Sequence, residues 1–61
     1  MVATFEVYTD KAGEYRWRLR SGNHQIIATS GEGYTSKAGV ENGIAAVKRD
    51  APDAEIVYTD N

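Results

Sequence analysis

Three arginines alternate with large apolar residues near the middle of the chain, and they offer the clearest chemistry in the sequence. Arg16, Arg18 and Arg20 occupy every second position. An extended strand points successive side chains to opposite faces, so all three guanidinium groups would lie on one face. Such a row could contact the phosphates of a nucleic acid or a nucleotide. The first hypothesis is therefore a strand that binds an anionic partner through its arginines.

The apolar residues of the same stretch favour a different interpretation. Tyr15, Trp17 and Leu19 would lie on the opposite face, and one surface cannot easily use both sets. The arginines would then form a solvated face, pair with carboxylates such as Glu6 or Glu14, and cover apolar surface with their aliphatic stems. The chain has 7 basic and 9 acidic residues and a net charge of −2, unlike a dedicated nucleic-acid binder. We therefore favour the solvated face and do not expect nucleic acid as the main partner.

A second candidate is the Gly-rich stretch 31–37, which leads into a predicted helix. A helix N-terminus attracts anions through its free N–H groups and its dipole. The hydroxyls of Thr35 and Ser36 and the ammonium group of Lys37 could add to such a site. The Gly-Lys-Ser/Thr order of a P-loop is missing, however, and Glu32 would repel an anion. The favoured alternative is a capped helix with Thr35 or Ser36 as its N-cap.

No residue pattern in the sequence points to catalysis. The only histidine, His24, lies in a predicted turn beside Gly22 and Asn23, two residues that tolerate a positive φ. No Ser/His/Asp signature accompanies it, and a general base would need a positioned partner. The chain has no cysteine, and a structural zinc site needs several nitrogen or sulfur ligands. We expect no catalytic site, no metal and no cofactor.

The pattern of apolar residues predicts the elements that would position these groups. Alternation and β-forming residues predict strands, Gly-containing polar segments predict turns, and 3.6-residue spacing predicts a helix. In Ile26 and Ile27 the apolar residues are adjacent, so the pattern does not decide which one faces the core. The helix should end before Pro52, because the residue before a proline disfavours the helical conformation. The predicted order is β-β-β-α-β, with strands at 3–9, 15–20, 25–30 and 55–59 and a helix at 36–50.

Two glycines inside the predicted helix suggest a close contact. Gly39 and Gly43 lie four residues apart and form a smooth strip with Ala46, although each glycine costs about 1 kcal/mol relative to alanine. The favoured interpretation is close approach by another backbone, such as that of a second subunit. The alternative is simple tolerance of weak helix formers. Tyr34 and Tyr58 could each belong to a core or to an interface.

The length of 61 residues indicates a single domain, residues 1–61, that is marginal on its own. Burial of apolar surface would contribute about 87 kcal/mol, and ordering the chain would cost about 92 kcal/mol. Without disulfides or metals, a partner subunit is the expected supplement. The sequence shows neither a membrane-spanning apolar run nor a signal-peptide pattern, so we expect a cytoplasmic protein with no membrane partner.

Several short motifs, taken in order, give the chain a family resemblance over roughly residues 4–58. The motifs are Phe5-Glu6-Val7-Tyr8, Trp17-Arg18-Leu19, Ile27-Ala28-Thr29-Ser30, Gly33-Tyr34-Thr35-Ser36-Lys37, Glu41-Asn42-Gly43-Ile44 and Val47-Lys48. With these motifs the chain resembles the YegP-like family of small bacterial and archaeal proteins, whose function is largely uncharacterised.

The resemblance implies an α+β fold built from a β-β-β-α-β unit. Two such units, as tandem repeats or as two subunits, form one continuous antiparallel sheet and exchange their C-terminal strands. This chain has one unit and looks like the homodimeric form, with Ile56, Val57 and Tyr58 in the exchanged strand. The expected function is a small dimeric binding or interaction module for a protein or a small molecule, without a catalytic site. A nucleotide or anion binder remains the alternative.

Overall fold

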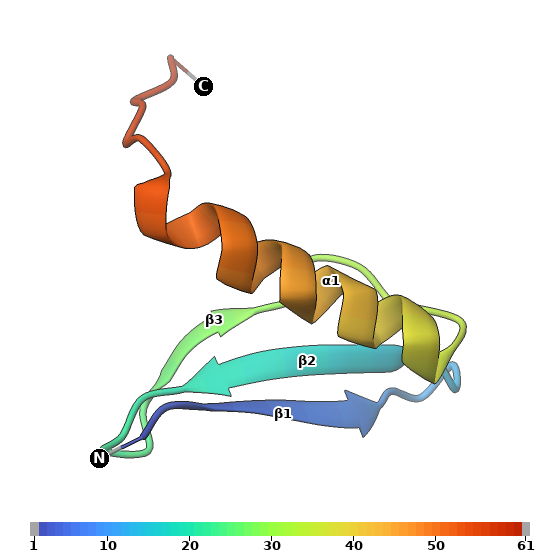
Figure 1. The fold of residues 1–61 in the computed structure, drawn as a ribbon. Coiled ribbons are helices and arrows are strands. Elements are labelled where there is room, and N and C mark those ends of the chain that lie inside the picture. Colours follow the sequence, from blue (N-terminus) through green and yellow to red (C-terminus); the bar gives the residue numbers. More distant parts are fainter. Residues whose placement is uncertain (1, 61) are drawn as a thin grey trace.

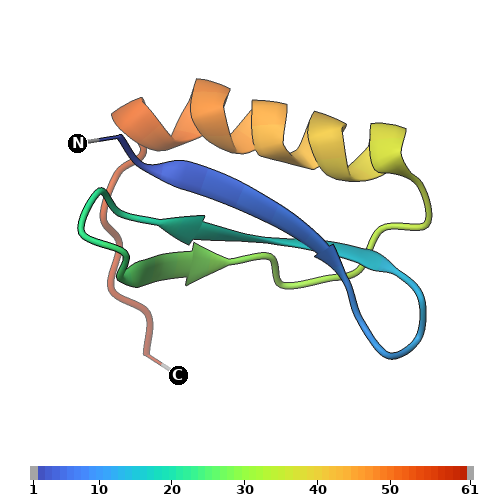
Figure 2. The same cartoon turned by 90° about the horizontal axis from the view of Figure 1, so that it is seen from below.

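The alternating segment around Trp17 forms the middle strand of a three-stranded antiparallel sheet. In the computed structural model, which describes residues 2–60, the strands are β1 (Thr4–Thr9), β2 (Tyr15–Arg20) and β3 (Ile26–Thr29). They are followed by the helix α1 (Lys37–Asp50) and a short 3₁₀ helix, η1 (Ala51–Asp53). The sheet order is β1-β2-β3, and α1 packs across one face (Figures 1 and 2). The predicted α+β order of three strands followed by one helix is confirmed.

The strand register sorts the side chains of β1 and β2 onto two faces. Phe5 lies opposite Leu19, and Val7 lies opposite Trp17, on the face beneath α1. Trp17 is only 6% exposed, and its ring meets that of Phe5 edge-on with 5.3 Å between the ring centroids. Val40 of α1 is fully buried. The core therefore lies between the middle strand and the helix, where the alternation predicts it.

The turn between β2 and β3 differs in detail from the turn that the sequence predicts. The positive φ falls on His24, at 73°, and not on Gly22 or Asn23. A register shift between Leu19 and Arg20 acts as a β-bulge in the ladder with β3. Ile26 and Ile27 are 51% and 60% exposed. Neither isoleucine enters the core of the single chain, because the edge strand bends at the bulge.

Helix α1 begins and ends where its capping residues predict. Ser36 is the N-cap, with an extended backbone, and its Oγ accepts a hydrogen bond from the N–H of Gly39 at 3.0 Å. Lys48 and Arg49 lie in the last turn, where their positive charges interact favourably with the negative end of the helix dipole. Pro52 falls in η1, directly after the helix. With 14 residues, α1 is too short to cross a membrane, and the described part of the chain contains no other helix that could do so.

The predicted fourth strand at residues 55–59 is wrong for the single chain. Residues 54–60, here called the tail, form no strand. A strand needs a neighbouring edge with which to share its backbone hydrogen bonds. The tail leaves the C-terminal end of α1 on the β3 side and runs away from β1 (Figure 1). Its sequence has the composition of a strand, but in one copy of the chain it lies beside no sheet edge.

Candidate functional site

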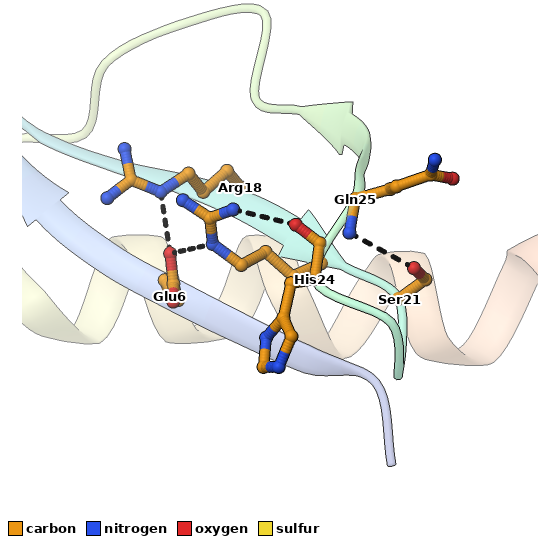
Figure 3. A network of polar contacts seen from close by, with 6 residues as sticks. Glu6, Arg18, Ser21, His24 and Gln25 are labelled. Carbon is orange, nitrogen blue, oxygen red and sulfur yellow. Dashed lines mark hydrogen bonds and ion pairs between the residues drawn. The ribbon is translucent and has the colours of Figure 1, made fainter. Parts of the chain in front are cut away.

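The three arginines of β2 lie on the sheet face opposite α1, here called the open face. Their cross-strand neighbours in β1 are Thr4, Glu6 and Tyr8. The Nε atoms of Arg18 and Arg20 converge on one carboxylate (Figure 3), because their side chains flank Glu6. The distance to Glu6 Oε1 is 2.7 Å from Arg18 Nε and 2.9 Å from Arg20 Nε. The predicted pairing with a carboxylate such as Glu6 is confirmed for Arg18 and Arg20.

Arg20 makes a second contact across the neighbouring turn. Its Nη1 donates to the carbonyl oxygen of His24 at 2.9 Å, on the residue with the positive φ (Figure 3). In the same turn, the N–H of Gln25 donates to Ser21 Oγ at 3.3 Å. The only histidine in the sequence therefore contributes its backbone carbonyl to the arginine network.

Arg16 pairs with a different carboxylate, at the other end of β2. Its Nε lies 2.6 Å from Asp10 Oδ2. The other oxygen of Asp10 accepts hydrogen bonds from the backbone N–H groups of Ala12 and Glu14, at 2.9 and 3.0 Å. Asp10 therefore closes the β1–β2 turn and holds Arg16 at once. The carboxylate that pairs with Arg16 is therefore that of Asp10 and not that of Glu14, which the sequence also suggested.

These contacts change the titration of the acidic groups. The hydrogen bond from Arg18, followed by that from Arg20, lowers the pKa of Glu6 below its ordinary value. The hydrogen bond from Arg16 and the backbone N–H of Glu14 lower the pKa of Asp10. The pKa of Arg16 is raised, chiefly by its hydrogen bond to Asp10. Both carboxylates therefore stay ionised at neutral pH, and the open face is a layer of paired charges.

One aromatic side chain shares the open face with the arginines. The guanidinium carbon of Arg18 lies 4.7 Å from the centroid of the Tyr8 ring. A guanidinium placed over an aromatic ring within about 6 Å is attracted by the quadrupole of the ring. Tyr15 and Trp17 face away from the arginines, whereas Tyr8 lies on the same face as they do. The cross-strand pair of Tyr8 with Arg16 is the pattern that places it here.

The start of α1 positions the second set of candidate residues. The Ser36 hydroxyl is occupied as the N-cap, which agrees with the favoured interpretation. Thr35 precedes it in the loop, and both residues are exposed. Lys37 opens the helix and lines an adjacent groove. The three residues are therefore contiguous at the helix N-terminus, with one of their two hydroxyls committed to the backbone.

A groove that the sequence did not predict runs between β1 and the first turns of α1. Its volume is about 640 Å³, and it is open to solvent along one side. Its lining is mixed, with apolar and aromatic side chains beside one lysine and one glutamate. The lining residues are Val7, Tyr8, Thr9, Tyr15, Lys37, Val40 and Glu41. Residues from three separate elements meet there, which explains why no local pattern reveals it.

The glycine strip of α1 packs against a side chain of the same chain. A Cβ atom at Gly43 would lie 2.5 Å from Tyr34 Oη and 2.8 Å from its Cζ. The Tyr34 backbone is held by two hydrogen bonds with Tyr15, both 2.8 Å long. Close approach at the glycines is therefore correct, but Tyr34 supplies it and not a second backbone. Tyr34 is half-buried and packs against the helix of its own chain.

Metal binding finds no support in the described residues. Within residues 2–60, no group of three histidine, aspartate or glutamate side chains could share a metal ion. The two carboxylates of the open face are engaged by arginines, as described above.

Comparison with known proteins gives a consistent family assignment. The family described as "Domain of unknown function (DUF1508)" matches residues 10–57. A UPF0339 protein from Treponema denticola is 49% identical over 57 residues, which cover 93% of this chain and 97% of the relative. A UPF0339 protein from Stutzerimonas stutzeri, from the 5′ region of the ptx operon, is 55% identical over 53 residues. That match covers 87% of this chain but only 47% of the relative, so the chain spans about half of its length.

Solved structures show the same architecture. The solution NMR structure of a protein from Haloferax volcanii has a TM-score of 0.87 and 53% identity, and covers 93% of this chain and 95% of that one. A solution NMR structure from Agrobacterium tumefaciens has a TM-score of 0.76 and 40% identity, over 93% and 90% of the two chains. These matches span nearly the whole length of each protein. The chain therefore belongs to the DUF1508 or UPF0339 family, the YegP-like small proteins of bacteria and archaea, whose function is unknown.

Proposed function

We propose that this chain is a non-catalytic interaction module that works as a homodimer, in which each tail adds a strand to the sheet of the other copy. The observation that carries this proposal is the exposure of the tail. Ile56, Val57 and Tyr58 are 87%, 72% and 92% exposed. Three consecutive large apolar residues with β-forming side chains are costly to leave in water. Pairing with a second copy would bury them.

The total surface of the chain supports the same proposal. Its accessible area is 5011 Å², whereas surface scaling gives roughly 3,900 Å² for a compact protein of this mass. The excess of about 1,100 Å² is comparable with the roughly 800 Å² that each partner buries in a standard interface. The surface that this chain leaves open is therefore large enough for one subunit interface.

The outer edge of β1 is the receiving edge that we propose. β1 pairs only with β2 among the described elements, so its other side is free to accept a strand. The groove beside it is lined in part by apolar side chains, of which Val7 is 46% exposed. The tail of the same chain leaves on the β3 side (Figure 1). The tail is therefore remote from the β1 edge of its own copy, and we propose that the tail of a second copy fills that edge.

The length of one relative agrees with a two-unit assembly. Because this chain matches 47% of the Stutzerimonas protein, that protein is long enough to hold two units in one chain. A covalent pair would bring two tails and two β1 edges together at high effective concentration. The single-unit chain would reach the same arrangement by dimerisation.

Sedimentation at several micromolar concentrations tests the assembly. The wild-type chain should sediment as a dimer, twice the chain mass of 6.7 kDa. Ile56→Asp should give a monomer, because it buries a charge in the proposed interface. Ile27→Asp is the matched control, since Ile27 is also exposed but lies on β3. A wild-type monomer would refute the proposal, and a dimer broken by Ile27→Asp but not by Ile56→Asp would place the interface at the other edge.

A further inference from the structure

Arg18 and Arg20 hold one more positive charge than their carboxylate partner neutralises. Arg16 has its own partner, Asp10, whereas Arg18 and Arg20 share Glu6. Both Nε atoms point to the same oxygen of Glu6. Two guanidinium groups against one carboxylate leave a surplus of one positive charge at Arg18 and Arg20. This surplus exists although the whole chain is acidic.

The geometry leaves the outer edges of these guanidinium groups available. Arg18 uses only Nε in its contact with Glu6, and Arg20 adds one bond from Nη1 to the His24 carbonyl. The remaining terminal N–H groups make no other hydrogen bond to residues 2–60, and each arginine side chain is about one-third exposed. Glu6 therefore fixes the orientation of both groups and leaves donors free. Fixed guanidinium donors are suited to phosphate oxygens, which they bind in a bidentate manner.

The position of Tyr8 adds a second kind of contact. Its ring is in contact with the Arg18 guanidinium, at 4.7 Å from the centroid. Planar groups such as nucleic-acid bases stack on aromatic rings and on guanidinium planes. Threonine hydroxyls flank the site, because Thr4 lies opposite Arg20 and Thr29 lies opposite Arg18. A phosphate with a planar base attached therefore fits this face better than a bare carboxylate does.

We propose that Arg18 and Arg20, held by Glu6 and flanked by Tyr8, form a binding site for the phosphate of a nucleotide, either free or within a single-stranded nucleic acid. All side chains of this site come from one copy, and its arginines lie on the face opposite the helix, so the site does not need the proposed dimer, although Tyr8 also lines the groove beside β1. Glu6 acts as a positioning residue that also competes with the ligand. Removing its charge should strengthen binding, since the surplus at the site would then rise by one.

NMR titration of the full-length chain at low salt tests this site. The probes are inorganic phosphate, adenosine monophosphate and a short oligothymidylate, and the signals are the side-chain Nε–H groups of the arginines. Those of Arg18 and Arg20 should move with all three probes, and that of Arg16 should move least. A lower Kd for the oligothymidylate than for adenosine monophosphate identifies a nucleic acid as the source of the phosphate. A lower Kd for adenosine monophosphate identifies a free nucleotide. Unmoved Arg18 and Arg20 signals at about 10 mM of every probe, well above a millimolar Kd, overturn the proposal.

Charge variants separate a specific site from general attraction. Arg18→Gln and Arg20→Gln should each weaken binding about tenfold, the range expected for a lost charged hydrogen bond. Arg49→Gln is the matched control, because it removes the same charge from the exposed end of α1 and should change affinity less than about twofold. Glu6→Gln should tighten binding. An equal loss for Arg18→Gln and Arg49→Gln, with circular dichroism showing folded proteins, would refute the site.

Salt provides a further readout for the oligothymidylate. If two phosphates are neutralised, the logarithm of affinity should fall with the logarithm of salt concentration at a slope of about −1.4. Affinity would then drop about sevenfold between 50 and 200 mM salt. A slope near zero would show that the arginines do not contact phosphate.

Discussion

Replacing Gly43 by alanine tests the packing of α1 against its own loop. The new Cβ would lie 2.5 Å from Tyr34 Oη, 2.8 Å from Cζ and 3.1 Å from Cε2. Two hydrogen bonds to Tyr15 hold the Tyr34 backbone, so the tyrosine can yield only through rotation of its side chain. The substitution therefore has to displace either the tyrosine ring or the helix.

Two opposing effects set the magnitude of this change. Alanine is about 1 kcal/mol more favourable than glycine in a helix interior. Overpacking of a filled site costs about 1–3 kcal/mol. The free energy of unfolding should therefore fall by up to about 2 kcal/mol in the wild-type background. In a Tyr34→Ala background the obstacle is gone, and the same Gly43→Ala change should raise stability by about 1 kcal/mol.

A double-mutant cycle measures the interaction directly. The four proteins are the wild type, Gly43→Ala, Tyr34→Ala and the double variant, unfolded in urea at one fixed protomer concentration. We expect a coupling energy of about 1–3 kcal/mol, the size found for residues in contact. A coupling energy below about 0.5 kcal/mol, or stabilisation by Gly43→Ala alone, would contradict the contact between Tyr34 and the glycine strip.

Three further predictions concern the loop, the helix start and the open face. Gly33→Ala should lower the free energy of unfolding in urea by about 1–3 kcal/mol, because the new Cβ would meet the side chain of Glu14. Gly31→Ala is the control: its Cβ would have no atom within 4 Å, so stability should change by less than about 0.5 kcal/mol. Equal effects of the two substitutions would contradict this packing. Ser36→Ala should lower the free energy of unfolding by about 1 kcal/mol and speed amide exchange in the first turn of α1, because the N-cap is lost. Ser36→Asp should retain the cap. Unchanged amide exchange in the alanine variant would contradict the capping role of Ser36. The pKa of Glu6 is lowered in the folded chain. Its contribution to the free energy of unfolding is therefore present above the pKa of the unfolded chain, about 4.3, and is lost as the pH falls through the folded pKa. Glu6→Gln should therefore show a shallower loss of stability on acidification, and identical acid profiles would refute the role of the pair.

Local periodicity was enough to predict the elements that bury one face. The alternation around Trp17 and the 3.6-residue spacing around Val40 place the core between β2 and α1, as observed. The N-cap at Ser36 follows from its chemistry, since a hydroxyl beside a helix start satisfies a free N–H group. The pairing of the arginines with Glu6 also follows from strand alternation, which puts both on one face.

Contacts between distant segments were not accessible in the same way. The Gly43 strip suggested a close neighbour, but only the folded loop identifies it as Tyr34. The groove beside β1 is lined by residues of three elements, and no periodic pattern in the sequence relates those residues to one another. For residues 55–59, composition predicts a strand, yet a strand forms only where an edge is present to receive it. The bulge beside Arg20 likewise depends on the register between two strands and leaves no mark on either one alone.

The position of the single tryptophan has a practical consequence for spectroscopy. Trp17 is the only tryptophan in the chain, and it lies dry beneath α1 against the ring of Phe5. Its indole emission should therefore be blue-shifted as long as the helix stays on the sheet, and it should turn red when that layer opens. The tail carries a tyrosine but no tryptophan. Fluorescence excited at the indole band thus follows the opening of the layer between α1 and the sheet, without any label.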